Sequence, residues 1–327
     1  MTIKRLVAFL GAAALIIGAL LIRNGLDDNS SGGGSGGSHS TDAPSGGKTT
    51  VVCSTQLAAV CTGLGKNYTV TIESAGTTLD RLAKDGATVP DAWITLDPFP
   101  GMLDTVRSIA NLPAATTGVT AVADDTPVLA VPKDRSAAVD AGCAGQTAWK
   151  CLGAAAGNTW VTIDAAAAGG DVLVGLTDPA SEDVGLVTFA NAVAGYFGVA
   201  QQDNSSFREP GFTSWLRSFS NNVKVVAPGT TPLATLLVRK TEVNVAATST
   251  SEIAASQRKA EVTTVPVTPA VSLTAVVASF TSRGKGVAAK VGPLFLAAGW
   301  ASPAAPQPQL PAGTFVALRA LWKEYNK

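Results

Sequence analysis

Residues that support catalysis are sparse in this chain, and their positions exclude the common enzyme arrangements. The single histidine, His39, lies in a stretch of small and polar residues from Asn29 to Gly47. Such a stretch cannot bury enough apolar surface to order itself, so we expect a flexible coil there. A Ser-His-Asp or Cys-His arrangement therefore cannot form in the rest of the chain. No Walker loop, G-x-S-x-G elbow or G-x-G-x-x-G fingerprint occurs either.

Two pairs of adjacent acids, Asp124/Asp125 and Glu182/Asp183, are the next candidates for chemistry. Glycosidase carboxylates face each other across a cleft, and adjacency in a turn does not provide this arrangement. We interpret both pairs as solvated or helix-capping acids, and we expect neither an enzyme nor a cofactor. An enzyme of another type remains an alternative. Basic and acidic residues balance at 24 each, so the basic surface that binds nucleic acid is absent.

Four cysteines form two local pairs, Cys53/Cys61 and Cys143/Cys151, and the members of each pair are eight positions apart. In an oxidising compartment, an even number of cysteines in close pairs indicates disulfides. The alternative is two pairs of buried free thiols. Zinc sites need tighter spacings such as C-x₂-C, and the folded part has no histidine to complete a ligand set. We expect no metal site.

The elements that must position any site alternate between β-branched runs and helix-like stretches. Strands are expected at 49–53, 68–73, 92–96, 126–131, 159–163, 172–176, 223–226, 242–247 and 262–267. Helices are expected at 56–64, 77–84, 101–110, 184–197, 212–220, 231–238, 285–299 and 314–325. This alternation predicts an α/β fold with mainly parallel sheets.

Turn signals follow several of these strands and directly precede helices. They are Asp97-Pro98, Asp124-Asp125, Asp178-Pro179 and Pro228-Gly229. In open α/β sheets, ligands bind at the carboxyl ends of the strands. Helix N-termini at that edge present free N–H groups and a partial positive charge. These turns are therefore the predicted location of a binding site.

Four segments carry a resemblance to a known family. They are TVTIESAGTTLDRLAKDGATVPDAWITLDPFPGML (69–103), PVLAVPKDR (127–135), GLTDPASEDVGLVTFANAVAGYFG (175–198) and GPLFLAAGWASP (292–303). In order and spacing they resemble type II periplasmic solute-binding proteins, the substrate-binding components of ABC transporters, and especially the molybdate-binding branch. The resemblance covers most of residues 48–303.

The resemblance implies a type II periplasmic-binding-protein fold with two lobes, each a mainly parallel sheet flanked by helices. Lobe 1 would comprise residues 48–125 and 244–327, and lobe 2 residues 126–243. A small polar solute would lie between the lobes, and hinge motion would enclose it. The implied function is a solute-binding module of an uptake system, with a transporter or another envelope protein as its partner.

The residues carried over from the resemblance are those at the strand-end turns. The predicted ligand-binding residues are Ser54, Thr55, Gly76, Thr77, Thr78, Thr95, Asp97, Thr126, Asp178, Ser181, Glu182 and Thr231. Their hydroxyl, carboxyl and backbone N–H groups would bind the ligand. The alternative interpretation is that these residues cap helices.

Two departures from the family pattern leave a second function open. Glu182 and Asp183 stand where the anion-binding branch has neutral residues, and their charges would repel an oxyanion. The helix expected at 56–64 is short and contains Cys61. The alternative is a cell-envelope interaction protein that keeps the binding-protein fold and contacts another protein or a polymer.

The N-terminus predicts the location of the protein. Lys4 and Arg5 precede an apolar run from Leu6 to Ile22, which is about 25 Å long as a helix. Residues 1–23 are therefore expected to form a membrane anchor or a signal segment, followed by a flexible linker at 24–47. A retained anchor, a cleaved signal peptide and a buried core helix are the three alternatives. The first two place the folded part outside the cytoplasm, on the membrane or secreted.

Overall fold

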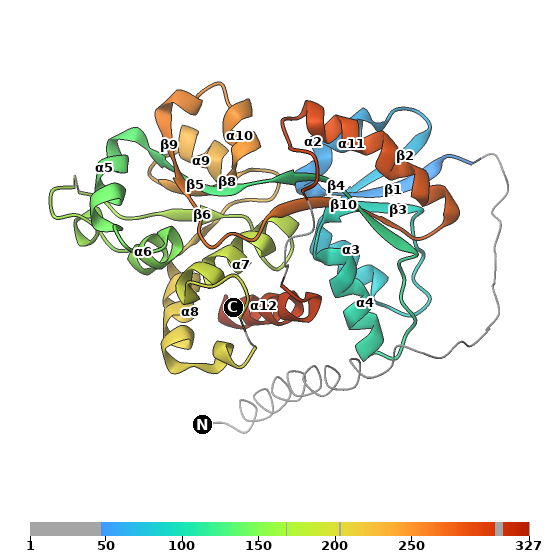
Figure 1. Ribbon diagram of the computed structural model, residues 1–327, viewed down its shortest axis with the longest axis horizontal. Coiled ribbons are helices and arrows are strands. Elements are labelled where there is room, and N and C mark those ends of the chain that lie inside the picture. Colours follow the sequence, from blue (N-terminus) through green and yellow to red (C-terminus); the bar gives the residue numbers. More distant parts are fainter. Residues whose placement is uncertain (1–46, 168, 203, 305–309, 327) are drawn as a thin grey trace.

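Two five-stranded sheets with helices on their faces lie side by side in the structure (Figure 1). The structure is a computed structural model that describes residues 47–167, 169–202, 204–304 and 310–326. The predicted anchor and nearly all of the predicted linker lie outside the described residues. Among the described residues, none of the helices has the length and hydrophobicity needed to span a bilayer.

The first sheet has the strand order β2-β1-β3-β10-β4. Its strands are β1 (Thr49–Ser54), β2 (Tyr68–Glu73), β3 (Ala92–Leu96), β4 (Gly118–Asp125) and β10 (Leu273–Ser279). β1 pairs in parallel with β2 and β3, whereas β10 pairs antiparallel with β3 and β4. All five residues of β3 are buried, as expected of a strand that helices cover on both faces.

The second sheet has the strand order β7-β6-β8-β5-β9. Its strands are β5 (Pro127–Pro132), β6 (Val174–Leu176), β7 (Lys224–Val225), β8 (Val245–Ser249) and β9 (Val262–Pro266). β6 pairs in parallel with β7 and β8, and β5 pairs antiparallel with β8 and β9. Each sheet therefore has two parallel and two antiparallel pairings, and the prediction of mainly parallel sheets is wrong.

The two chain crossings explain this mixture. β4 continues almost directly into β5, and β9 leads into β10, so the strands on both sides of a crossing extend from one sheet into the other. A strand–helix–strand unit makes its two strands parallel. The crossing strands β5 and β10 are not joined to their neighbours in this way, and they pair antiparallel with them. The crossings also place β8 and β9 with the second sheet, not with the first sheet as the predicted boundary at Asn244 required.

The helices mostly lie where the sequence predicts them. They are α2 (Ala58–Cys61), α3 (Ala75–Leu82), α4 (Phe99–Ile109), α5 (Lys133–Gly142), α6 (Ala148–Ala155), α7 (Asp183–Phe197), α8 (Pro210–Asn222), α9 (Pro232–Val238), α10 (Thr250–Ala255), α11 (Val287–Ala297) and α12 (Ala312–Tyr325). Residues 159–163, predicted as a strand, instead contain a short 3-10 helix, Trp160–Thr162, in which the Thr162 and Ile163 N–H groups donate to the Thr159 and Trp160 carbonyls.

Helix α7 occupies the middle of the molecule (Figure 1). Twelve of its fifteen residues are buried, which is typical of a helix that is apolar on all sides and surrounded by other elements. Gly198 ends the helix with a φ of 74°, a left-handed conformation that glycine adopts without strain. At the other end of the helix, Asp183 accepts a hydrogen bond from the Leu96 N–H, so the N-terminus of α7 lies beside β3 of the first sheet.

Candidate ligand site between the lobes

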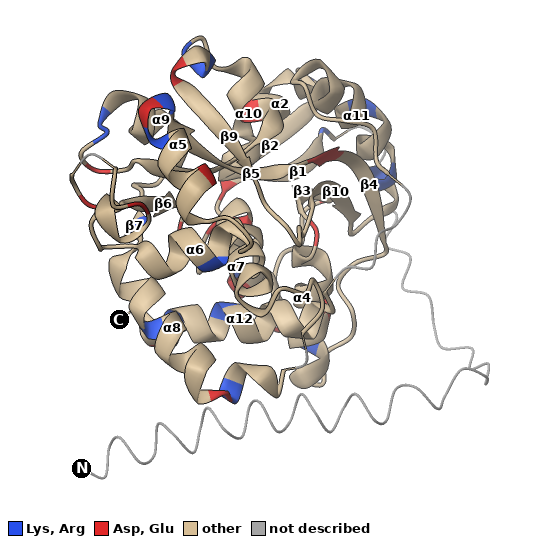
Figure 2. Ribbon diagram, turned by 60° about the vertical axis from the view of Figure 1, so that its left-hand side comes forward, with Lys and Arg blue, Asp and Glu red and all other residues tan. Residues whose placement is uncertain are grey.

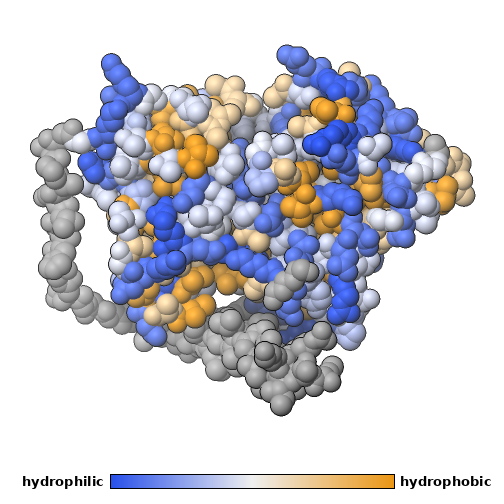
Figure 3. Space-filling model, turned by 180° about the vertical axis from the view of Figure 1, so that it is seen from behind, coloured by the Kyte–Doolittle hydropathy of each residue, from blue (hydrophilic) through white to orange (hydrophobic). Residues whose placement is uncertain are grey.

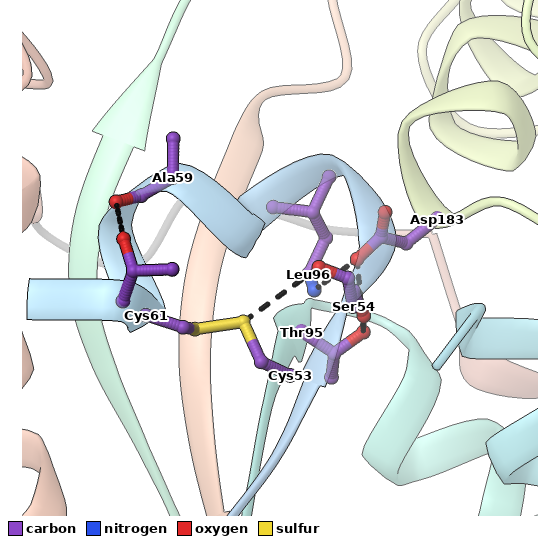
Figure 4. Close-up of a disulfide and its surroundings, with 8 residues drawn as sticks. Cys53, Ser54, Ala59, Cys61, Thr95, Leu96 and Asp183 are labelled. Carbon is purple, nitrogen blue, oxygen red and sulfur yellow. Dashed lines mark hydrogen bonds between the residues drawn. A yellow bond between two sulfur atoms is a disulfide. The ribbon is translucent and has the colours of Figure 1, made fainter. Parts of the chain in front are cut away.

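Each sheet with the helices that cover it is called a lobe below, the first lobe containing β1 and the second containing β5. The lobes meet at the carboxyl group of Asp183, which is fully buried and lies beside Ser54, Thr95 and Leu96 (Figure 4). Its Oδ2 accepts hydrogen bonds from the Thr95 hydroxyl at 3.0 Å and the Leu96 backbone N–H at 3.1 Å. The Ser54 hydroxyl donates to the Thr95 hydroxyl at 2.9 Å. Burial raises the pKa of Asp183, while hydrogen bonds from the Thr95 hydroxyl and from the Val184 and Leu96 N–H groups oppose this shift. A side chain of the second lobe thus occupies a hydrogen-bonding site of the first.

A second contact joins the N-terminus of α3 to the loop that precedes α7. The Gly76 N–H donates to the Ser181 carbonyl at 2.8 Å. A Cβ atom at Gly76 would lie 2.5 Å from the Ala180 carbonyl oxygen, which is closer than packed atoms approach. Glycine is required here by the close approach of the two lobes, not by its backbone angles.

Helix α12 bridges this contact from outside. The Arg319 guanidinium donates to the Ala180 carbonyl at 2.7 Å and forms a two-pronged ion pair with Asp80 at 2.6 and 2.9 Å. The Trp322 indole N–H donates to Asp178 at 2.9 Å. Two residues one helical turn apart on α12 therefore hold α3 of the first lobe and the 178–182 loop of the second.

Glu182 lies in the same loop and is 5 % exposed. Burial, together with the nearby Asp183 and Asp178 carboxyl groups, raises its pKa to about 7, and a hydrogen bond with Gln56 opposes the shift. Its Oε2 atom is buried and has no hydrogen-bond partner among the described residues, and the same holds for the Thr177 hydroxyl. Native structures rarely leave such groups unsatisfied.

A further polar cluster lies at the crossing between β4 and β5. Asp125 accepts hydrogen bonds from the Thr250 hydroxyl at 2.8 Å and the Ser251 N–H at 3.2 Å, and it also contacts the Ser251 hydroxyl. Beside it, burial raises the pKa of Glu252, whereas hydrogen bonds with Thr231 and Thr248 lower it. This cluster fixes the N-terminus of α10 against the crossing.

The structure brings half of the predicted site residues to the contact between the lobes. These are Ser54, Gly76, Thr95, Asp178, Ser181 and Glu182. Asp97 is next to them in sequence and half-buried, and burial raises its pKa. Their ability to bind a ligand stays a prediction.

The other predicted site residues have local roles or are exposed. Thr231 caps α9 by accepting from the Ala234 N–H at 3.1 Å, and the buried Thr78 donates to Glu73 at 2.6 Å. Thr77 and Thr126 are exposed, and Thr55 is half-buried. Thr231 therefore has the helix-capping role that was the alternative to ligand binding.

The structure also contains residues that the sequence did not single out for the site. Asp183 was recognised as a charge but not as a contact to the other lobe, and Gln56, Thr177 and Arg319 were not considered. The only sequence feature that pointed to Asp183 was its position directly after Glu182, which was predicted as a site residue. It could not reveal that Asp183 reaches Thr95, which lies 88 positions away.

Both local cysteine pairs form disulfides, Cys53–Cys61 and Cys143–Cys151. The first links the end of β1 to α2, directly beside Ser54 (Figure 4). The second links the end of α5 to α6. The first disulfide therefore restrains the turn that carries Ser54 and Gln56.

Other surface features lie away from this contact. An apolar groove of about 350 Å³ between β4 and α11 is lined by residues such as Val122, Pro293 and Leu296. Figure 3 shows the hydrophobic residues of the rear face in separate patches bounded by hydrophilic ones. Among the described residues, no group of three or more His, Cys, Asp or Glu side chains has the geometry of a metal site.

Comparison with solved structures shows which fold this is. The chain is similar to the periplasmic binding protein AfuA from Actinobacillus pleuropneumoniae, whose structure contains fructose-6-phosphate. The two sequences are 12 % identical, the match covers 86 % of this chain and 99 % of that chain, and the TM-score is 0.56. It is also similar to iron-bound HitA from Pseudomonas aeruginosa, with 13 % identity, coverage of 86 % and 100 %, and a TM-score of 0.55. The ferric binding protein from Campylobacter jejuni matches with 12 % identity, coverage of 84 % and 98 %, and a TM-score of 0.52.

These similarities define the class of fold as that of the periplasmic substrate-binding proteins, which is the class that the sequence motifs predicted. At these identities they establish the fold alone. No protein-family model matches the sequence, and no curated protein matches it.

Proposed function

We propose that the chain is a membrane-tethered, extracytoplasmic solute-binding module of the ABC-transporter type, which holds a small polar ligand between its two lobes. Lobe 1 would comprise residues 47–125 and 273–304, and lobe 2 residues 127–266, with α12 bridging the two. The tether would act as a coil with a reach of roughly 25–30 Å. A transporter or another envelope protein would receive the ligand.

One observation carries this proposal. Polar groups near the ends of β1 and β3 and in the 178–183 segment after β6 meet between the lobes, and one of them, Glu182 Oε2, is buried without a partner among the described residues. The Thr177 hydroxyl, directly after β6, is also buried without a described partner. In a protein interior, such groups are normally satisfied by protein, water or ligand. The fold binds its ligands at the same edge, outside the carboxyl ends of the strands.

A ligand screen tests the proposal on the full-length chain in detergent micelles. Thermal unfolding is followed with oxyanions, sugars, amino acids and amines, each added in turn. A ligand present at a hundred times its dissociation constant adds about 2.7 kcal/mol to the free energy of unfolding. Thr177→Val should weaken binding of any ligand found, whereas the same change at the exposed Thr69 should not. A folded protein that responds to none of the compounds would contradict the proposal.

A second candidate is the envelope interaction protein with a degenerate binding site. The buried contact of Asp183 with Thr95 and Leu96 favours it, because this contact closes the lobes without a solute. This function predicts that no compound in the screen shifts unfolding. It also predicts that the Leu96 amide stays protected from hydrogen exchange whatever small molecule is added.

A further inference from the structure

Two hydrogen-bond donors of the first lobe that would suit an oxyanion are already in use. The Thr95 hydroxyl and the Leu96 N–H both point at Asp183 Oδ2, and Ser54 supports Thr95 (Figure 4). Hydroxyl and backbone N–H groups at strand ends are the donors that bind anionic oxygens. An external oxyanion would have to displace a carboxyl group that is covalently part of the chain.

The turns around this contact carry acids and no basic residue of their own, and the one arginine that contacts them in the described hydrogen bonds, Arg319, comes from α12. Residues 54–56, 74–78, 95–98, 125–126, 177–183, 228–231 and 249–252 contain no lysine, arginine or histidine. They contain six acids, namely Asp97, Asp125, Asp178, Glu182, Asp183 and Glu252. Figure 2 shows Asp and Glu segments in the middle of the molecule, around the N-terminal part of α7. The nearest basic group in the contacts, Arg319, is paired with Asp80. An anion would be repelled in such surroundings, and a cation attracted.

The unsatisfied group at the contact requires a hydrogen-bond donor. A carboxylate accepts hydrogen bonds through both oxygens, and Glu182 Oε2 is buried with no donor among the described residues. The hydrogen bond with Gln56 shows that this side chain faces the first lobe. In its ionised form Glu182 therefore lacks a hydrogen-bond donor at an oxygen that is buried beside the first lobe.

The cation that fits is organic rather than a metal ion. A bound divalent ion needs several protein ligands arranged around it, and the described residues contain no such group. An ammonium group combines a positive charge with directional N–H donors, and one or two acceptors hold it in a charge-assisted hydrogen bond. We propose that the site between the lobes binds an organic ammonium ion, with Glu182 as the residue that accepts its hydrogen bond. This inference rests on the proposed solute-binding function.

Matched probes test the ligand class on the full-length chain in detergent micelles. The ammonium probes are ethanolamine, 1,4-diaminobutane and glucosamine. Their uncharged counterparts are ethylene glycol, 1,4-butanediol and N-acetylglucosamine, and the anions are sulfate, molybdate and fructose 6-phosphate. We expect at least one ammonium probe to raise the unfolding temperature and to bind in calorimetry, with its counterpart at least tenfold weaker.

Two variants then locate the site. Glu182→Gln keeps the size of the side chain and removes its charge, and it should weaken ammonium binding at least tenfold. Glu324→Gln, at an exposed position on α12, should bind as the unaltered chain does. Equal affinity of Glu182→Gln and the unaltered chain would overturn the assignment of Glu182.

The remaining outcomes separate this inference from the proposed function. Binding of an anion or of an uncharged probe, with no response to the ammonium probes, would refute the ligand class and leave solute binding standing. If a folded protein responds to none of the probes and to none of the broader screen, both the inference and the proposed function fail. Circular dichroism of each variant establishes that it is folded before its binding is interpreted.

Discussion

At the scale of single residues, Asp183 is the most consequential side chain of the site. It is fully buried and accepts hydrogen bonds from the Thr95 hydroxyl and from two backbone N–H groups, those of Leu96 and Val184. Removing an acceptor from buried donors leaves each donor with an unmet desolvation cost of about 1–3 kcal/mol. The contact therefore contributes to holding the lobes together as well as to occupying the first-lobe donors.

Asp183→Ala is expected to lower the free energy of unfolding by roughly 3 kcal/mol, because buried donors lose their acceptor. Tryptophan fluorescence during urea unfolding measures the change. Asp140→Ala serves as the control, since Asp140 is exposed on α5, and it should change stability by less than about 0.5 kcal/mol. If the two variants lost similar amounts of unfolding free energy, the hydrogen bonds of Asp183 would not contribute measurably to stability.

The acid pair also predicts how stability depends on pH. The pKa of Glu182 is raised from 4.5 to about 7, so between these values the folded protein binds more protons than the unfolded chain. Stability from this group is present below about pH 4.5 and is lost as the pH rises through about 7. Relative to Glu182→Gln, the unaltered chain should lose on the order of 3 kcal/mol across this interval.

Urea unfolding at closely spaced pH values measures this difference. The curve for Glu324→Gln should run parallel to that of the unaltered chain. A constant difference between the unaltered chain and Glu182→Gln from pH 4 to 8 would mean that Glu182 titrates as in the unfolded state.

Half of the predicted site residues lie at the contact, and the reason is local. Ser54 and Thr95 lie in the last two residues of β1 and β3, and Glu182 lies in the turn after β6, so their place at the sheet edge follows from periodicity and turn signals alone. The hydrogen bond of Asp183 with Thr95 depends on the distance between the two lobes in the folded chain, and a sequence pattern does not contain this distance. The same is true of Arg319, which reaches the site from a helix 139 positions beyond the Ala180 carbonyl that it contacts.

At the scale of elements, the approach of α3 to the 178–182 loop has no room for a side chain. Gly76→Ala would place a Cβ 2.5 Å from the Ala180 carbonyl and 2.7 Å from the Arg319 guanidinium. Overpacking of this kind costs about 1–3 kcal/mol. We expect this loss of stability, measured by urea unfolding.

Gly313→Ala is a matched control for this substitution. Gly313 lies in α12, and a Cβ there would meet nothing within 4 Å. Alanine should therefore raise stability by up to about 1 kcal/mol through its better helix propensity. A neutral or stabilising effect of Gly76→Ala would mean that the two elements can separate freely.

The elements themselves were predicted unevenly. Strands with a strong β-branched pattern, such as β1, β2 and β5, were found, as were the long helices α7 and α12. β4 and β10 were not predicted, although β10 lies between two strands of its sheet. These two strands, GVTAVADD and LTAVVAS, mix valine with alanine and threonine, and their strand structure depends on the neighbours that pair with them.

At the scale of the whole molecule, the two crossings decide which segments share a lobe. The predicted boundary at Asn244 followed the family resemblance, whereas strand pairing places β8 and β9 beside β5 in the second sheet. Sequence periodicity identifies a strand but not its partner. Lobe composition was therefore less predictable than either the fold class or the strand-end turns.

The last prediction concerns closure of the lobes. Arg319 contacts Asp80 and the Gly76 carbonyl on the first-lobe side and the Ala180 carbonyl on the other. Arg319→Met keeps much of the side-chain volume but loses these hydrogen bonds, so the lobes should open more often. Because the Gly76 and Leu96 N–H groups donate across the contact, their hydrogen exchange reports this opening directly.

We expect Arg319→Met to speed exchange at Gly76 and Leu96 roughly tenfold, or about 1.4 kcal/mol of local stability, while amides of β8 keep their rates. Arg208→Met, at an exposed arginine, should leave both amides unchanged. Faster exchange throughout the protein would indicate global destabilisation, and unchanged exchange at both amides would show that α12 does not control closure. A local increase would instead establish α12 as the element that controls opening of the contact between the lobes.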